Sequence, residues 1–213
     1  DEHGAGGIAL FNSHDDVAAE VDNVAQAVAE NSQGLIIFSL MKREATVAAL
    51  RSYLTGCPVV WVDRFFLDLP IWYASSDNRR GGYLATEHLL KQGRRRIAFV
   101  AEMVHETVLG RFEGYREALG DHGVPFDRRL VGVADGGTPA VPEAVRKVLT
   151  VEPRPDAFFF GNDYWALAGL QQIKASGLRV PDDVAVVGYD DMAMAAYADP
   201  PLPTIRQDAV AMG

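Results

Sequence analysis

The sequence predicts an α/β fold built from mostly parallel strands, and three observations lead to that prediction. Short apolar runs without polar alternation recur along the 213 residues, as expected for strands covered on both faces. Amphipathic helix patterns lie between the runs, so the order β-α-β repeats along the chain. Most runs also end in a hydrogen-bonding side chain, at the edge where parallel sheets bind ligands.

The predicted strands are rich in Val, Ile, Leu and Phe. They are residues 7–11, 35–38, 59–62, 97–100, 130–133, 157–160 and 184–187. The polar residues that follow them include Asn12, Ser39, Asp63, Glu102, Asp135, Asn162 and Asp190. Capping of the next helix explains about half of these polar ends. The others predict a polar ligand-binding cleft.

The predicted helices carry apolar residues three and four positions apart. In the first, Val17, Val21 and Val24 form one stripe after the N-cap candidates Asp15 and Asp16. The other stripes lie within 47–54, 84–90, 112–119, 141–149 and 165–173. Gly or Pro follows each of these, which predicts where the helices end.

Composition and charge define the class of protein. The chain is 48% hydrophobic and 23% charged, as in globular proteins, and no apolar run approaches the roughly 20 residues of a membrane span. The net charge is −9, whereas a nucleic-acid-binding domain usually has a basic face. The run Arg94-Arg95-Arg96 is interpreted as a solvated helix-to-strand corner. We therefore expect a soluble, cytoplasmic protein that does not bind DNA through these residues alone.

Catalytic and metal motifs are not found in the sequence. Cys57 is the only cysteine, and the five histidines do not pair at metal-ligand spacing. The glycine-rich start at 4–7 does not follow a strand, and there is no nucleophile elbow or phosphate-binding loop. An acid–base pair of Asp163 and Asp190 would lack a nucleophile or metal to complete it. We expect a binding protein without cofactor or metal, and not an enzyme.

Three groups of motifs resemble the LacI/GalR family of bacterial transcriptional regulators. The first is VPDDVAVVGYDD at 180–191 with PLPTIRQ at 201–207. The second runs from Ser76-Asp77-Asn78 to Arg96-Ile97, and the third joins RFEGYREAL at 111–119 to FGND at 160–163. The resemblance implies two Rossmann-like lobes of the periplasmic-binding-protein type I, truncated at both ends. One lobe would comprise 1–92 plus 206–213 and be incomplete, the other 93–205, and the DNA-binding headpiece would be absent.

The resemblance also implies ligand-binding residues. Arg111 matches an arginine that reaches the effector, and its fork geometry suits sugar hydroxyls or a carboxylate. Asp190 matches an acceptor for ligand hydroxyl or N–H groups, and Asn162 matches a polar pocket position. The neighbouring Asp163 is expected to be an N-cap. Replacing Arg111 by alanine is expected to abolish effector binding and leave the fold intact.

Four further positions are weaker ligand-binding candidates. His105 and Thr107 lie in a loop that contacts the effector in some family members. Asp77 could bind ligand or support the hinge. Asp135 lies where several members carry an aromatic platform. Trp72, Tyr73 and Trp165 could replace that aromatic, although we expect all three to be packed in the core.

The resemblance implies a homodimeric repressor or other regulator that senses a small polar effector, expected to be a sugar. Operator DNA would be bound only through the headpiece. The alternative is a solute-binding protein of a sugar ABC transporter with the same fold, and an enzyme ranks third. The native N-terminus distinguishes the first two: a helix-turn-helix indicates the regulator, and a signal sequence indicates the transporter component.

Overall fold

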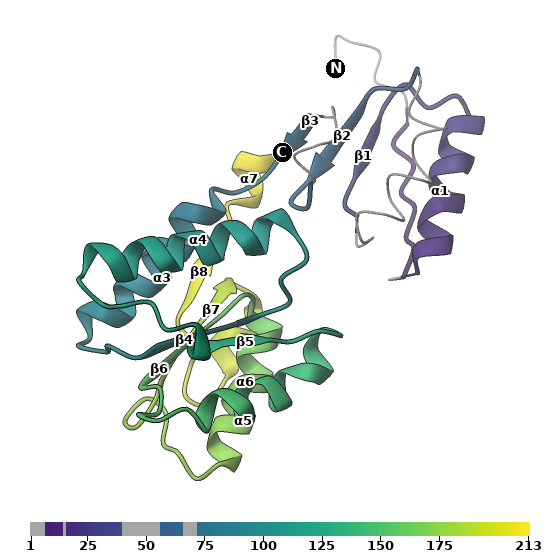
Figure 1. Cartoon of the computed structure of the whole chain (residues 1–213). Coiled ribbons are helices and arrows are strands. Elements are labelled where there is room, and N and C mark those ends of the chain that lie inside the picture. The colour runs from purple at the N-terminus through teal and green to yellow at the C-terminus, as the bar shows by residue number, and fades with distance from the viewer. Residues whose placement is uncertain (1–6, 15, 40–55, 66–71) are drawn as a thin grey trace. The chain divides into compact units, whose positions relative to one another are not determined.

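The computed structural model describes residues 7–14, 16–39, 56–65 and 72–213, which belong to two compact units. The first unit is Asp1–Ala74 and the second is Ser75–Gly213 (Figure 1). By contacts, residues 75–92 belong to the second unit, whereas the family resemblance placed them in the first lobe. The lobe boundaries implied by that resemblance, including the return of 206–213 to the first lobe, stay a prediction.

The first unit contains a small parallel sheet in the order β1-β2-β3. Its strands are β1 (Leu35–Ile37), β2 (Val59–Val62) and β3 (Trp72–Ala74), preceded by helix α1 (Val17–Ala29). The Asp16 carboxylate caps α1 by accepting a hydrogen bond from the Ala19 N–H at 2.9 Å, as predicted. The core of this unit is Val24, Ile37, Val59 and Trp61.

Two sequence-based expectations for the first unit are wrong, and a third lies outside the described residues. Residues 7–11 pair with no described strand and form no strand themselves, and Ile8 and Leu10 are almost fully exposed. Trp72 is exposed and Tyr73 is 48% exposed, so neither is the core residue that we expected. Tyr73 instead stacks on Phe65, with ring centroids 3.9 Å apart. The helix predicted within 47–54 lies outside the described residues.

The second unit is built on a five-stranded parallel sheet in the order β5-β4-β6-β7-β8. The strands are β4 (Ile97–Ala101), β5 (Val131–Val133), β6 (Ala157–Phe160), β7 (Ala185–Asp190) and β8 (Thr204–Arg206). All residues of β4 and β6 are buried, which matches their continuous apolar sequences. The parallel α/β fold predicted from the sequence is therefore confirmed.

Helices cover both faces of this sheet (Figure 1). On one face lie α3 (Asn78–Lys91) and α4 (Glu106–Asp121), and on the other lie α5 (Val141–Leu149) and α6 (Asp163–Ala175). Short 3₁₀ turns cover Arg128–Leu130, Thr138–Ala140 and Ala193–Tyr197, and the short helix α7 (Ala209–Met212) follows β8. None of the described helices is long and apolar enough to cross a membrane.

The ends of the main helices follow the sequence signals. After α3, Gly93 has a φ of 86°, and the Arg94 N–H bonds back to the Leu89 carbonyl at 3.1 Å. A residue with a Cβ rarely adopts this left-handed conformation, which explains the glycine.

Trp165 is 7% exposed, so it is a core residue as expected.

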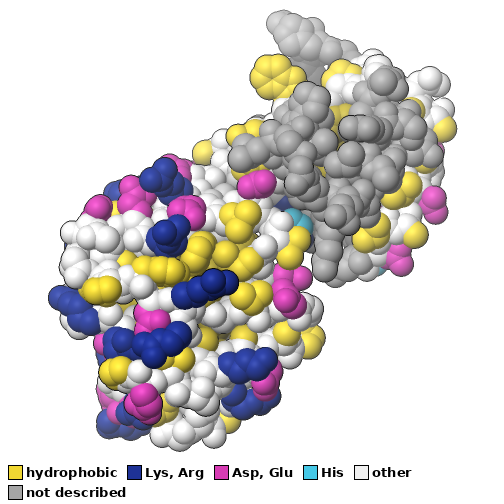
Figure 2. All heavy atoms as spheres, in the orientation of Figure 1, with side chains coloured by type: hydrophobic (Ala, Val, Ile, Leu, Met, Phe, Trp, Pro, Cys, Tyr) yellow, Lys and Arg dark blue, Asp and Glu magenta, His cyan; other side chains and the backbone are white. Residues whose placement is uncertain are grey.

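The Arg94-Arg95-Arg96 run anchors loops of its own unit. Arg94 donates to the Pro181 carbonyl at 2.6 Å, and Arg96 donates to the Pro153 carbonyl at 2.6 Å. The backbone N–H groups of Arg95 and Arg96 both bond to the Asp156 carboxylate. On the face shown in Figure 2, Lys and Arg side chains of this unit are interspersed with Asp and Glu. The run therefore forms a structural corner, in agreement with the sequence-based interpretation.

Glycines allow α3 and α4 to pack closely, which explains why α3 belongs to the second unit. A Cβ on Gly82 of α3 would overlap the carbonyl group of Arg111 on α4. A Cβ on Gly114 of α4 would overlap the carbonyl oxygen of Arg79 on α3. Because the two backbones touch at these points, the position of α4 relative to α3 is fixed.

We predict that Gly114→Ala destabilises the second unit by at least about 2 kcal/mol, because the added methyl group has no space between the helices. Gly120→Ala in the same helix is the matched control, since a Cβ there meets nothing within 4 Å. That control should be neutral or stabilising by up to about 1 kcal/mol. Urea unfolding followed by circular dichroism measures both variants, and equal stabilities would contradict the assigned contact.

Candidate functional site

The candidate site lies at the carboxyl edge of the five-stranded sheet. Because all five strands are parallel, the segments after β4, β6 and β7 meet at this edge. Asp190 is the last residue of β7 and Asn162 follows β6, while Thr107 and Arg111 lie in α4, the helix that follows β4. The sheet order therefore brings together residues that are far apart in the sequence.

Arg111 is the centre of this cluster, and its side chain is only 4% exposed. Its Nε–H donates to the Asn78 Oδ1 at 2.8 Å, and its Nη1 donates to the Gly161 carbonyl at 2.5 Å. The same Nη1 lies 3.6 Å from Asp190 Oδ1. No described acceptor bonds to Nη2. One corner of the guanidinium is therefore left to donate to a ligand.

The Tyr189 ring supports the guanidinium from one side. The Arg111 Cζ lies 3.7 Å from the ring centroid, which is a close cation–π contact between buried groups. The tyrosine ring packs against Gly81, and a Cβ at that position would overlap the tyrosine hydroxyl. Arg111 is thus held in one orientation before any ligand binds.

Asp190 lies at the end of β7 in an unusual backbone conformation, with a φ of 112°. Its Oδ1 accepts a hydrogen bond from the Gln207 Nε2 at 2.7 Å. Gln207 is bonded in turn to the Ser76 hydroxyl at 2.8 Å. A non-glycine residue at positive φ costs on the order of 1–3 kcal/mol, and such strain is often found at functional sites.

Asn162, and not Asp163, is the N-cap of α6. The Asn162 Oδ1 accepts the Trp165 N–H at 2.8 Å, while its amide nitrogen bonds to no other described residue. Our expectation that Asp163 caps this helix was wrong. Asp163 is the first helical residue and is fully buried, so its carboxylate accepts from Thr204 and from the Met192 N–H instead.

Burial raises the pKa of the Asp163 carboxyl, although its hydrogen bonds act in the opposite direction. The folded protein therefore holds this proton more tightly than the unfolded chain does. Its contribution to stability falls as the pH rises from the ordinary Asp value through the raised value.

The weaker candidates are placed less favourably. Asp77 caps α3 by accepting the Arg80 N–H at 2.8 Å, which agrees with a supporting role. His105 is the N-cap residue of α4 without a side-chain cap bond, and Thr107 is buried in the first turn. Asp135 is exposed after the edge strand β5. Two strands separate β5 from β7, so the ends of these two strands lie about 14 Å apart across the sheet.

Sequence reasoning missed Asn78, Tyr189 and Gln207 as members of the cluster. All three lie inside the motifs that carry the family resemblance, and that was the available signal. Their roles depend on contacts between segments up to 131 positions apart, such as that of Ser76 with Gln207. No periodicity or spacing reveals such contacts.

The side chains of the cluster suit a polar ligand. It offers donors on Arg111 and Asn162 and acceptor oxygens on Asp190, which together match vicinal hydroxyl groups. The charges of Arg111 and Asp190 offset each other. Within the described ranges, no group of three or more His, Cys, Asp or Glu side chains could hold a metal ion.

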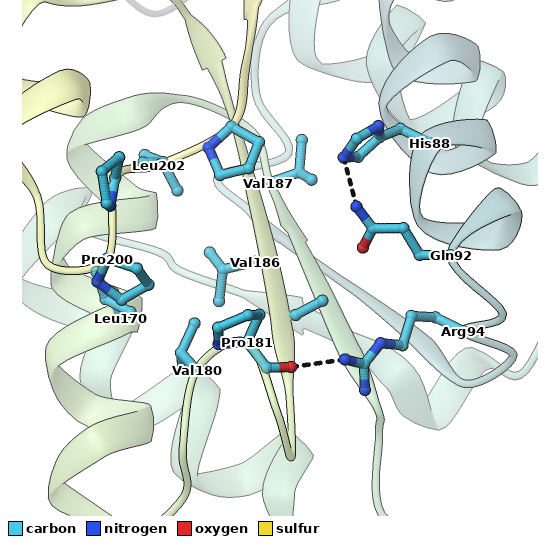
Figure 3. A pocket seen from close by; sticks show the side chains of 13 residues that line it. His88, Gln92, Arg94, Leu170, Val180, Pro181, Val186, Val187, Pro200 and Leu202 are labelled. Carbon is cyan, nitrogen blue, oxygen red and sulfur yellow. Dashed lines mark hydrogen bonds between the residues drawn. The ribbon is translucent and has the colours of Figure 1, made fainter.

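A separate cavity of about 310 Å³ lies between the end of α3, the first half of β7 and the loop before β8. Its walls are mostly apolar, with His88, Gln92 and Arg94 on the α3 side and Pro200 and Leu202 opposite (Figure 3). Its polar groups are bonded to the protein itself, as in the pair of His88 with Gln92 at 2.8 Å. None of the candidate ligand-binding residues lines this cavity.

The parallel sheet and the preformed polar cluster define a ligand-binding domain of the open α/β class. Residues 86–213 match the family described as periplasmic binding protein-like domain. The chain belongs to this family.

Similar proteins support this assignment. The transcriptional regulator CelR of Thermobifida fusca is 38% identical over 189 residues, which cover 86% of this chain and 54% of CelR. A structure of a CelR–cellobiose complex is 34% identical with a TM-score of 0.81, covering 92% of this chain and 60% of that one. A LacI family regulator from Enterococcus faecium with bound ribose is 26% identical with a TM-score of 0.76, covering 91% and 71%. The chain thus spans about half the length of the curated CelR sequence.

We predict that Arg111→Ala lowers the free energy of unfolding by about 3 kcal/mol, since it removes the buried donor to the Asn78 amide oxygen and the Gly161 carbonyl, and the cation 3.6 Å from Asp190. The expectation that the variant still folds and no longer binds effector stays a prediction. Arg116→Ala, in the same helix but exposed, should change it by at most about 0.5 kcal/mol. Chemical denaturation of the two variants tests this difference; a stable Arg111→Ala protein would show that the cluster is not structural.

Proposed function

We propose that this chain is the effector-sensing core of a bacterial transcriptional regulator and that its effector is a small neutral sugar. The observation that carries the proposal is the preformed pair of Arg111 and Asp190 at the strand ends, with the Asn162 amide beside it. Two similar proteins are known in complexes with cellobiose and ribose, which supports a sugar. Of the seven candidates, we assign ligand contact first to Arg111, Asn162 and Asp190. His105, Thr107, Asp77 and Asp135 stay secondary candidates.

A neutral ligand fits the charges of the cluster. Arg111 already has a carboxylate 3.6 Å away, so an anionic ligand would compete with Asp190 for the same cation. Vicinal hydroxyls can instead accept from the guanidinium and donate to the carboxylate at once. Such a ligand adds bonds without breaking the existing pair.

The regulatory step follows from linkage. A ligand that makes more contacts in one conformation of the protein favours that conformation, and only by its difference in affinity for the two conformations. The expected coupling to operator binding is on the order of 1–3 kcal/mol. Operator contact is assigned to a headpiece outside residues 1–213, in keeping with the net charge of −9. The working form is a cytoplasmic homodimer, and no catalytic turnover is expected.

The solute-binding protein of a transporter is the weaker alternative. Relatives with this fold across most of the chain are named as transcriptional regulators. These matches favour the regulator.

The homodimer can be tested by sedimentation velocity of the full-length protein, where a monomer at micromolar concentration would contradict it.

We predict that one member of a panel of sugars, polyols and nucleobases, which includes cellobiose and ribose, raises the melting temperature. At 100 times its dissociation constant a ligand stabilises the protein by about 2.7 kcal/mol. Differential scanning fluorimetry finds the ligand and titration calorimetry gives its affinity. A phosphorylated sugar should bind more weakly than its neutral counterpart.

The variant Asn162→Asp sharpens this test, because aspartate also caps helices but cannot donate a hydrogen bond. We expect an unchanged melting temperature of the ligand-free protein and an affinity at least about tenfold lower for the ligand found. The exposed-site variant Arg116→Ala should bind as the original chain does. If only catalytic conversion of a panel compound were seen, or no compound bound, the proposal would be wrong.

A further inference from the structure

The Asp163 carboxylate is buried at the start of α6, yet it does not cap that helix. Asn162 supplies the cap, and Asp163 points toward the segment that connects β7 to β8. A fully buried carboxylate is costly unless several donors satisfy it. Its donors therefore show which part of the structure it organises.

Two of those donors flank Asp190 in the sequence, and the third lies on the neighbouring strand β8. The Asp163 Oδ2 accepts the Met192 N–H at 2.8 Å, and the Tyr189 backbone contributes a further hydrogen bond. The Asp163 Oδ1 accepts the Thr204 hydroxyl at 2.7 Å from the neighbouring strand. One carboxylate thus binds the residue before Asp190, the residue two positions after it, and the strand beside it.

The segment held in this way is strained. Asp190 has a φ of 112° and Asp191 has a φ of 55°, two consecutive non-glycine residues at positive φ. Such conformations persist only where the surroundings determine them. The Thr204 Oγ1 also accepts the Asp191 N–H at 3.2 Å, so the hydroxyl links Asp163 to the strained pair.

Gly188 shows that β7 is adapted to this carboxylate. A Cβ at position 188 would overlap the Asp163 Oδ1, although the φ of Gly188 does not itself require glycine. The glycine is needed for space. The strand that carries Asp190 therefore has a gap at the place where Asp163 enters.

We propose that Asp163 is a positioning residue of the effector site, which holds the Asp190 carboxylate in place against Arg111 through the hydrogen bonds to Tyr189, Met192 and Thr204. Asp163 itself does not touch the ligand. The effect on affinity rests on the proposed function, whereas the effect on the geometry of Asp190 does not.

The first arm of the test needs no ligand. Crystal structures of Asp163→Asn and of the milder variant Thr204→Val are compared with that of the unaltered chain. We expect Asp190 to leave its positive φ in Asp163→Asn and the Arg111–Asp190 separation to exceed the ion-pair range of about 4 Å. If Asp190 keeps its conformation in both variants, the proposal is overturned, whatever the ligand.

The second arm measures binding of cellobiose, and of ribose, by titration calorimetry. We expect at least about a tenfold loss of affinity in Asp163→Asn and a smaller loss in Thr204→Val, at temperatures where both are folded. Asp182→Asn, an exposed aspartate of the same unit, is the control and should bind normally. A variant that melts earlier but binds with unchanged affinity would reduce Asp163 to a purely structural role.

A double-mutant cycle separates positioning from direct contact. In an Asp190→Asn background, Asp163→Asn should weaken binding by less than about twofold, because its effect acts through Asp190. Additive losses would contradict the proposal. If neither sugar binds the unaltered chain, the proposed sugar effector is wrong for these two compounds, and the crystal structures alone then decide whether Asp163 positions Asp190.

Discussion

A cation that is withdrawn from water must be surrounded by acceptors, and in this protein the Arg111 guanidinium imposes that requirement on four elements. Its acceptors come from the start of α3, the end of β6 and the end of β7, while Arg111 itself belongs to α4. None of these partners can move far without leaving a buried charge unsatisfied. The geometry of the candidate site therefore depends on the same contacts as the packing of the second unit. Substitutions of the residues that contact Arg111 affect both stability and binding.

Close approaches of the backbone make this arrangement possible. Gly82 and Gly114 bring α3 and α4 into contact, Gly81 admits the Tyr189 ring, and Gly188 admits the Asp163 carboxylate. At each of these positions a Cβ would overlap the neighbouring group, so only glycine leaves enough space. The rigid part of the site thus depends on residues that contribute no chemistry of their own.

Much of the fold could be predicted from the sequence, because buried parallel strands are continuous apolar runs with sharp ends. The strands at 59–62 and 157–160 match the structure to the residue. The run at 7–11 is also mostly apolar but forms no strand, which shows that an apolar run does not by itself guarantee a hydrogen-bonding neighbour. Asn162 and Asp163 show the same limit for the site. Both are good caps by residue type, and only burial against Thr204 and Met192 distinguishes their roles.

The positive φ of Asp190 has a consequence for how the ligand preference of this site can change. At most positions of a binding site, a change of ligand preference needs only a change of side chain. At position 190 any replacement must also tolerate a backbone that glycine, asparagine and aspartate accept far better than other residues do. Few single substitutions are therefore accessible there, and new specificities are expected to evolve through the surrounding positions while the carboxylate is retained.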